Sequence, residues 1–207
     1  MTDTPAPRSA RAARDRLLGA AIEAFAQRGF HGTTTRDLAA AAGMSPAAVY
    51  VHYRTKEELL FEISLTGHRY TLATIEAADD PGATPPQRLH AVMHAFALHH
   101  AVDHTAALVV NYEMAALAEE HRQQIREIRA QINALIRGIV DAGVADGVFR
   151  IGDPRTATLA LVSMGVDIAR WYRPGRELSA GQIADFYAEL ALRTVDSAET
   201  NVVRDTP

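Results

Sequence analysis

The 207-residue chain contains no cysteine. This absence excludes disulfide bonds, thiolate metal ligands and a cysteine nucleophile, and it favours a reducing compartment. The sequence also lacks an apolar stretch of the roughly 18 residues that a membrane-spanning helix requires. The N-terminal arginines are followed by an acidic residue before any long apolar segment, so no secretion signal is indicated. We therefore expect a cytoplasmic protein that does not insert into membranes.

Strand patterns and catalytic motifs are missing as well. No segment of convincing length alternates apolar and polar residues; apolar residues instead recur three and four positions apart. We therefore expect an all-α fold of about nine helices, separated by glycine, proline and capping residues. A glycine-rich phosphate loop, a nucleophile elbow and a close acid–base pair are absent. No catalytic residue and no cofactor is assigned, and we do not expect an enzyme.

The net charge of −4 does not by itself suggest a nucleic-acid-binding protein. The distribution of charge is more informative. Residues 1–60 contain 8 Lys/Arg and 6 Asp/Glu, a balance of +2, whereas residues 61–207 contain 13 and 19, a balance of −6. A basic N-terminal part on an acidic body fits a protein that contacts DNA at one end.

Three helix-start signals follow one another closely in the N-terminal part of the chain. Thr34 precedes a helix with an acidic third position, Ser45 precedes a proline, and Thr55 with Glu58 forms a T-x-x-E capping box. Gly43 supplies a tight turn between the first two of these helices. Two helices joined by a short glycine-containing turn form the helix-turn-helix motif.

The second of these short helices has a size and a surface suited to DNA. About nine residues span roughly 13 Å at 1.5 Å per residue, close to the ~12 Å width of the major groove. Small side chains such as Ala47 keep its first turn slim, and the hydroxyls of Thr34 and Thr35 can bind phosphate oxygens. The alternative is an ordinary corner of two helices in a bundle, but there the exposed face is expected to carry Glu and Lys.

The segment "F..RGFHGTTTRDLAAAAGMSPAAVYVHYRTKEELL", Phe25 to Leu60, resembles the DNA-binding domain of TetR-family transcriptional regulators. The resemblance implies an all-helical homodimer that binds a near-palindromic double-stranded DNA operator. It further implies a repressor that a small-molecule effector releases from that operator. We accordingly expect a helix-turn-helix DNA-binding domain at 9–56, a ligand-binding and dimerisation domain at 57–198, a disordered tail at 1–8 and a C-terminal tail at 199–207.

Carried over position by position, the resemblance assigns DNA contacts from the start of the second helix to the start of the fourth. For Tyr50 and Tyr53 the alternative is that their rings only brace the small domain. The candidate DNA-binding residues are Thr34, Thr35, Arg36, Ser45, Pro46, Ala47, Tyr50, His52, Tyr53 and Lys56.

The segment "RWYRPGRELSAGQIADFYAEL", Arg170 to Leu190, is similar to a subgroup that regulates fatty-acid and steroid catabolism and responds to acyl-CoA thioesters. This similarity implies a CoA ester as effector, with Arg170 and Trp171 near its nucleotide or acyl portion. Alternatively, Trp171 packs at a dimer interface and Arg170 pairs with a carboxylate. The candidate effector-binding residues are Arg170, Trp171, Phe96, His100 and Tyr112.

The last two predicted helices carry small residues beside a periodic apolar stripe, which is more apolar surface than one small domain needs. Two such helices from each subunit could form a four-helix interface. They could instead only close the core of the monomer. The candidate dimer-interface residues are Ala160, Met164, Ile183, Phe186, Tyr187 and Leu190.

Histidines cluster on one predicted helix and its continuation. Two pairs, His90 with His94 and His100 with His104, have the i, i+4 spacing that can chelate a transition metal. No cysteine and no H-E-x-x-H motif supports a metal site, so none is assigned, and a pocket-lining or solvent-facing role is favoured. The alternative function is a metal- or pH-sensing repressor that uses the cluster from His90 to His104.

Overall fold

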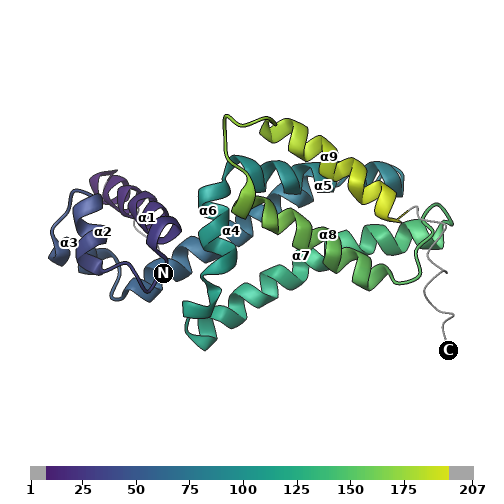
Figure 1. The fold of residues 1–207 in the computed structure, drawn as a ribbon. Helices are drawn as coiled ribbons and strands as arrows, with labels where there is room; N and C mark the ends of the chain where they lie inside the picture. The colour runs from purple at the N-terminus through teal and green to yellow at the C-terminus, as the bar shows by residue number, and fades with distance from the viewer. Residues whose placement is uncertain (1–7, 196–207) are drawn as a thin grey trace, which may run out of the picture. The chain divides into compact units, whose positions relative to one another are not determined.

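The computed structural model describes residues 8–195. Over this range the chain forms nine α-helices and one 3-10 helix and contains no strand, which confirms the all-α prediction (Figure 1). The expected tails lie outside the described residues, except that Arg8 already belongs to the first helix. The helices are α1 (Arg8–Arg28), α2 (Thr35–Ala41), α3 (Pro46–His52), α4 (Lys56–Ala78), α5 (Pro85–Val102), α6 (His104–Tyr112), η1 (Met114–Ala116), α7 (Glu119–Ala145), α8 (Pro154–Trp171) and α9 (Ala180–Val195).

The predicted helix starts are capped by side chains as expected. The Thr34 hydroxyl accepts a hydrogen bond from the backbone N–H of Asp37 at 3.2 Å, and Ser45 accepts one from Ala48 at 3.2 Å. The turn between α2 and α3 passes through Gly43 with a φ of +64°, a left-handed conformation that favours glycine. Local sequence therefore determines where α2 and α3 begin.

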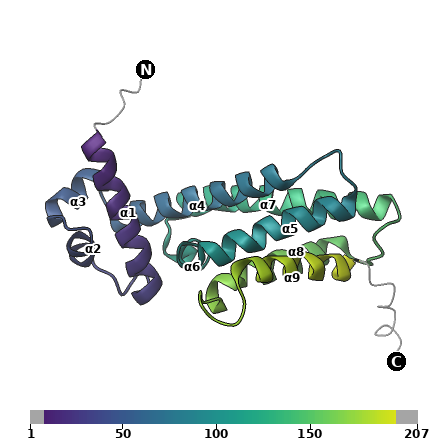
Figure 2. The same cartoon turned by 90° about the horizontal axis from the view of Figure 1, so that it is seen from above.

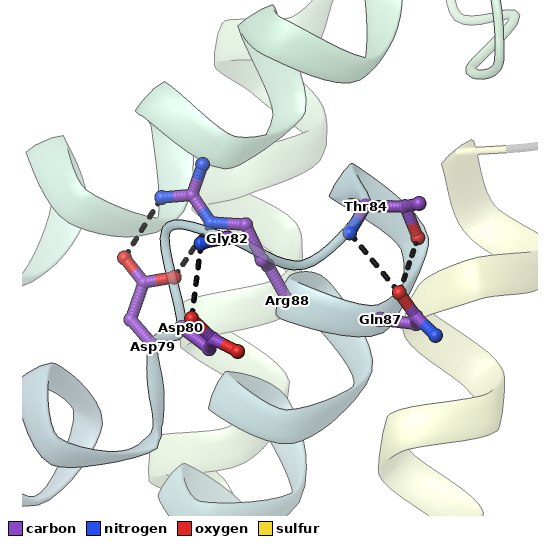
Figure 3. Close-up of polar contacts among 6 residues, drawn as sticks. All are labelled: Asp79, Asp80, Gly82, Thr84, Gln87 and Arg88. Carbon is purple, nitrogen blue, oxygen red and sulfur yellow. Dashed lines mark hydrogen bonds and ion pairs between the residues drawn. The ribbon is translucent and has the colours of Figure 1, made fainter.

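The connection between α4 and α5 is held by a group of polar contacts (Figure 3). Arg88 binds Asp79 through two hydrogen bonds, from Nε at 2.7 Å and from Nη2 at 2.9 Å. The backbone N–H of Thr84 donates to Gln87 Oε1 at 3.0 Å, and Thr84 Oγ1 donates to the same oxygen at 2.8 Å. These contacts fix the turn that joins the end of α4 to the start of α5.

Residue contacts divide the chain into two compact units that do not follow chain order. The first is described over residues 8–67 and 105–125, and the second over 68–104 and 126–195. This grouping differs from two consecutive segments divided at residue 56, because α4 and α7 each contribute to both units. As a result, nearly all of α6, η1 and the start of α7 belong with the helix-turn-helix.

The first unit has one apolar core that joins its helices. Leu17 from α1, Leu38 from α2 and Val49 from α3 are buried in it, and Leu60 from α4 and Val109 from α6 complete it. Each short helix of the helix-turn-helix thus has its own buried anchor, which compensates for the marginal stability of isolated helices of this length.

The second unit is built on α5, which packs along α9 and α8 (Figures 1 and 2). Small side chains allow this approach: Ala97, Ala101 and Ala184 are fully buried between the helices. On α8, a Cβ at Gly165 would lie 2.6 Å from the Phe96 ring, so only glycine fits there. Within residues 8–195, no helix combines the length and the apolar character needed to cross a membrane.

Candidate nucleic-acid interface and effector site

The outward face of α3 is the first candidate interface. Val49 anchors the helix with 3% of its surface exposed, whereas Tyr50 is 55% and Val51 81% exposed. Ser45, Pro46 and Ala47 at the start of α3 are exposed as well. The helix is shorter than expected, because Tyr53 already has extended backbone angles (φ −139°, ψ 126°). Sequence reasoning missed Val51, although an exposed valine beside a buried one is a signal for contact with a partner, such as a thymine methyl group.

At the start of α2, one of the three candidate DNA-binding side chains already forms hydrogen bonds within the protein. The Thr34 hydroxyl donates to Asp37 Oδ2 at 2.7 Å in addition to accepting from its backbone. These hydrogen bonds from Thr34 lower the pKa of Asp37. Thr35 is half-buried and Arg36 is exposed, so of these positions Arg36 is the most accessible to a phosphate.

Tyr53 lies inside the first unit. Its ring is 7% exposed, and its hydroxyl accepts a hydrogen bond from Arg14 Nε at 2.9 Å. Arg14 also pairs with Glu62 at 2.9 Å and so joins α1, the end of α3 and α4. Burial raises the pKa of Tyr53. Of the two alternatives for this residue, the geometry supports bracing.

Lys56 is directed towards the protein's own loop. Its Nζ donates to the backbone carbonyls of Phe30 and Thr33, each at 2.6 Å, and lies 4.1 Å from the centre of the Phe30 ring. Burial lowers the pKa of Lys56. The ammonium group therefore holds the segment that precedes α2, while His52 lies half-buried at the end of α3.

The connector between α6 and α7, residues 113–118, is tied to the helix-turn-helix at two points. The Glu113 carboxylate accepts a hydrogen bond from the backbone N–H of Phe30 at 3.2 Å. Glu57, in the first turn of α4, accepts one from the backbone N–H of Ala118 at 2.8 Å and contacts His121 Nδ1 at 2.8 Å. Sequence reasoning missed both ties, because each joins residues more than sixty positions apart.

A surface cavity of about 630 Å³ lies beside the end of α8. Trp171, which is 45% exposed, lines it together with Arg173 and Arg176 from the loop that follows. Glu177 lines it too and adds a negative charge. Arg170 is not among the lining residues and instead contacts Asp167 at 3.4 Å. Sequence reasoning chose Arg170 and missed the two arginines that share the cavity with the indole.

The remaining candidate effector residues lie in different settings. Phe96 and His100 are 1% and 2% exposed, with ring centres 4.4 Å apart, in the core of the second unit. Tyr112 belongs to the first unit and is 42% exposed. The structure thus brings Phe96 and His100 together but does not group Tyr112 with them.

The histidines of the cluster do not share a common partner: two of them contact different aspartates. His94 Nε2 contacts Asp185 at 3.2 Å, and His99 Nδ1 contacts Asp103 at 3.1 Å. Across residues 8–195, no group of three or more His, Asp or Glu side chains is arranged to hold a metal ion. The metal-sensing alternative therefore has no support from the geometry.

The candidate dimer residues also separate into two groups. Phe186 is 54% exposed, and Leu159, which sequence reasoning missed, is 49% exposed. Ala160 is exposed, and Met164, Tyr187 and Leu190 are half-buried. Ile183 is the exception: it is 3% exposed and packs in the core between α5, α8 and α9. It is therefore withdrawn from the candidate surface.

Comparisons with known proteins identify the family. Residues 17–63 match the family model described as bacterial regulatory proteins, tetR family. Residues 82–195, more than half of the chain, match the tetracyclin repressor-like C-terminal domain. The chain belongs to the TetR family. The resemblance indicated by the N-terminal motifs is thereby confirmed, and the chain is a DNA-binding transcriptional regulator of this family.

Individual relatives are similar to this chain over most of their length. The HTH-type transcriptional repressor KstR2 of Rhodococcus jostii RHA1 is 32% identical over 188 residues, 86% of this chain and 89% of that protein. A solved structure of a tetR-family regulatory protein from Rhodococcus RHA1 is 43% identical with a TM-score of 0.86, covering 90% of this chain and 98% of that one. AibR, solved in complex with isovaleryl coenzyme A and operator DNA, is 26% identical with a TM-score of 0.79, covering 86% and 97%.

The TetR N-terminal match covers most of α1, all of α2 and α3, and the start of α4, which is where the exposed face of α3 lies. The C-terminal match covers α5 to α9, including the cavity beside Trp171. Both candidate sites therefore fall inside regions that the family assignment covers.

Proposed function

We propose that this TetR-family regulator is a homodimeric repressor that an acyl-CoA thioester releases from a near-palindromic operator. The observation that carries the DNA-binding half is the face of α3: a capped helix, fixed by Val49, with Tyr50 and Val51 standing outward. A short rigid helix with small residues in its first turn suits the major groove.

The DNA contacts divide into reading and positioning roles. Ser45, Pro46, Ala47 and Tyr50, together with Val51, face the bases. The side chains of Thr35, Arg36 and His52 contact the phosphate backbone. Thr34, Tyr53 and Lys56 act mainly from within, since their polar groups are bonded to Asp37, Arg14 and the Phe30–Thr33 loop. Removing one of the inner residues should weaken binding by loosening the helix-turn-helix.

The cavity beside Trp171 supports the effector half of the proposal. The indole offers a flat face for an adenine ring, and the guanidinium groups of Arg173 and Arg176 match phosphate oxygens. Phe96 and His100 contact the buried acyl portion, while Arg170 and Tyr112 remain proposed outer contacts. The likeness to AibR, whose structure holds isovaleryl coenzyme A, is consistent with this ligand class.

The exposed apolar residues of α8 and α9 supply the proposed dimer interface. Leu159, Ala160 and Phe186 are exposed on these two helices, and Met164, Tyr187 and Leu190 flank them. A two-fold dimer through this surface presents two copies of α3 to half-sites about 34 Å apart, one turn of DNA.

The proposal is tested by thermal unfolding of the purified protein with a panel of acyl-CoA thioesters, free CoA, fatty acids and divalent metals. A ligand present at about 100 times its dissociation constant adds roughly 2.7 kcal/mol to the stability of the folded state. We expect an upward shift with acyl-CoA thioesters that exceeds the shift with free CoA. A shift with fatty acids alone, or with none of the panel, would contradict the ligand class.

A further inference from the structure

A groove on the surface of the second unit lies between α7 and α8 and has a volume of about 340 Å³. Its apolar floor is formed by Ala130 and Ala134, both exposed on α7, and by Leu159 of α8, which is 49% exposed. An apolar cavity of about 150 Å³ already holds a benzene molecule. The groove therefore has room for one aromatic side chain.

The two uncharged polar residues of the groove offer little to a polar ligand. Asn133 donates from Nδ2 to the Arg129 carbonyl at 2.9 Å, and its Oδ1 is buried beneath the surface. The hydroxyl of Thr158 donates to the Pro154 carbonyl, also at 2.9 Å. Both side chains thus spend their donors on their own helices, and the groove is left with its apolar floor and its charged residues.

The charged residues that line the groove are both arginines. Arg155 is exposed in the first turn of α8. Arg137 of α7 contacts Asp141 on its own helix at 2.7 Å, with 35% and 50% of the two side chains exposed. Exposed ion pairs of this kind contribute little to stability, so Arg137 can exchange Asp141 for another carboxylate. The groove is therefore suited to a group that is apolar in the middle and negatively charged beside it.

The exposed face of α9 has the complementary character. Phe186 is 54% exposed, and Asp185 and Glu189 are exposed beside it on the same side of the helix. Each carboxylate has only a surface partner: Asp185 contacts His94 at 3.2 Å, and Glu189 contacts Arg193 at 2.9 Å. We call Asp185, Phe186 and Glu189 the α9 stripe. Phe186 does not line the α7–α8 groove of its own subunit.

We propose that in the dimer Phe186 of each subunit enters the α7–α8 groove of the other, with Asp185 and Glu189 facing Arg137 and Arg155. Two-fold symmetry makes the two contacts equivalent, as in any interface in which the same surface serves both subunits. This inference rests on the proposed function in that it takes the protein to be a dimer through α8 and α9. It extends that surface onto α7, and Leu159 belongs to both the groove and the surface.

The test is a charge exchange in the full-length protein, followed by analytical ultracentrifugation. The groove variant carries Arg137→Glu and Arg155→Glu, and the stripe variant carries Asp185→Arg and Glu189→Arg. Each variant alone places like charges at both contacts of its own dimer. We therefore expect each to associate at least about tenfold more weakly than the parent.

Mixing the two variants is the decisive step. In a mixed dimer one contact has exchanged but opposite charges, and the other contact keeps the charges of the parent. The equimolar mixture is therefore expected to form dimers with an affinity close to that of the parent. If mixing restores no association, or if neither variant alone is weakened, the inference is wrong.

Two further variants and the parent complete the experiment. Ala134→Trp fills the groove with the subunit's own side chain and should weaken association without any change of charge. Arg69→Glu, at an exposed arginine of α4 in the same unit, is the control and should associate as the parent does. A parent that sediments as a monomer would overturn the proposed dimer itself. A dimeric parent with an equally dimeric Ala134→Trp variant would overturn only the contact with the groove.

Discussion

At the scale of single residues, side chains close together in sequence divide between the exposed face of α3 and the interior of the first unit. Tyr50 and Tyr53 lie within four positions of each other, yet Tyr50 is exposed and Tyr53 is buried against Arg14. The difference follows from the end of α3, since Tyr53 has already left the helix and turns back into the core. Residue type alone does not show which of the two tyrosines is exposed and which is buried.

Replacing Tyr50 by Ala is expected to weaken operator binding by roughly 1–3 kcal/mol, because a base-facing contact is lost while the fold is unaffected. Fluorescence anisotropy with an operator selected from a random duplex pool measures the change. Tyr70→Ala is the matched control, since Tyr70 is similarly exposed but lies in the second unit. Equal losses in the two variants would show that α3 does not read the operator.

The buried His100 predicts a pH dependence of stability. Its folded-state pKa is about 3, below the ordinary value of 6.5, so between these values the unfolded chain binds a proton that the folded chain does not. The free energy of unfolding therefore falls as the pH falls below 6.5, by about 1.4 kcal/mol per pH unit for one group.

Urea unfolding between pH 7 and pH 5 measures this slope. His100→Gln, which does not titrate, should show a slope smaller by one proton. Burial also lowers the pKa of His99, which contributes in the same direction in both proteins. Parallel slopes for parent and variant would contradict the assigned protonation state.

At the scale of elements, the sequence predicted most of the helix starts and few of the tertiary contacts. Thr34, Ser45 and Thr55 cap their helices through hydrogen bonds that span three residues, which a local pattern can encode. The bond from Lys56 to the Phe30 carbonyl and the burial of Ile183 depend on how distant segments pack, and no local pattern contains that information.

No sequence pattern associates the α6–α7 connector with DNA binding. It holds the α1–α2 loop through Glu113 and the first turn of α4 through Glu57. Because α6 follows directly from α5, a change around His100 has a covalent route to this connector. The coupling between effector and DNA can therefore use the connector as well as α4.

Glu113→Ala removes the contact to the Phe30 N–H. We expect the effector to release less operator from this variant, because coupling of about 1–3 kcal/mol can reside in such contacts. Effector affinity in the absence of operator should change by less than about twofold. Glu120→Gln is the control, an exposed carboxylate on the first turn of α7. Anisotropy titrations with effector, with and without operator, measure both quantities. Full release in Glu113→Ala would exclude the connector from the coupling route.

At the scale of the whole molecule, the proposed mode of operator binding requires two subunits. In the proposed complex, one copy of α3 reads one half-site, and a near-palindromic operator needs a second copy at a fixed distance. The surface proposed to fix that distance includes Phe186 and Leu159, two large apolar side chains that are about half exposed.

Phe186→Arg is expected to convert the dimer to a monomer, because it places a charge in an apolar interface, and to weaken operator binding at least tenfold. Analytical ultracentrifugation measures the mass. Val102→Arg is the control, since Val102 is 59% exposed and lies on α5 rather than on α8 or α9. A dimeric Phe186→Arg protein would place the interface elsewhere.

The most direct test of the central claim is release of the selected operator by an acyl-CoA thioester, followed by fluorescence anisotropy at constant salt. Anisotropy is expected to fall to the value of free DNA as an acyl-CoA is added, whereas the same concentration of free CoA leaves the complex intact. An operator complex that persists at saturating concentrations of every acyl-CoA that binds the protein would contradict it.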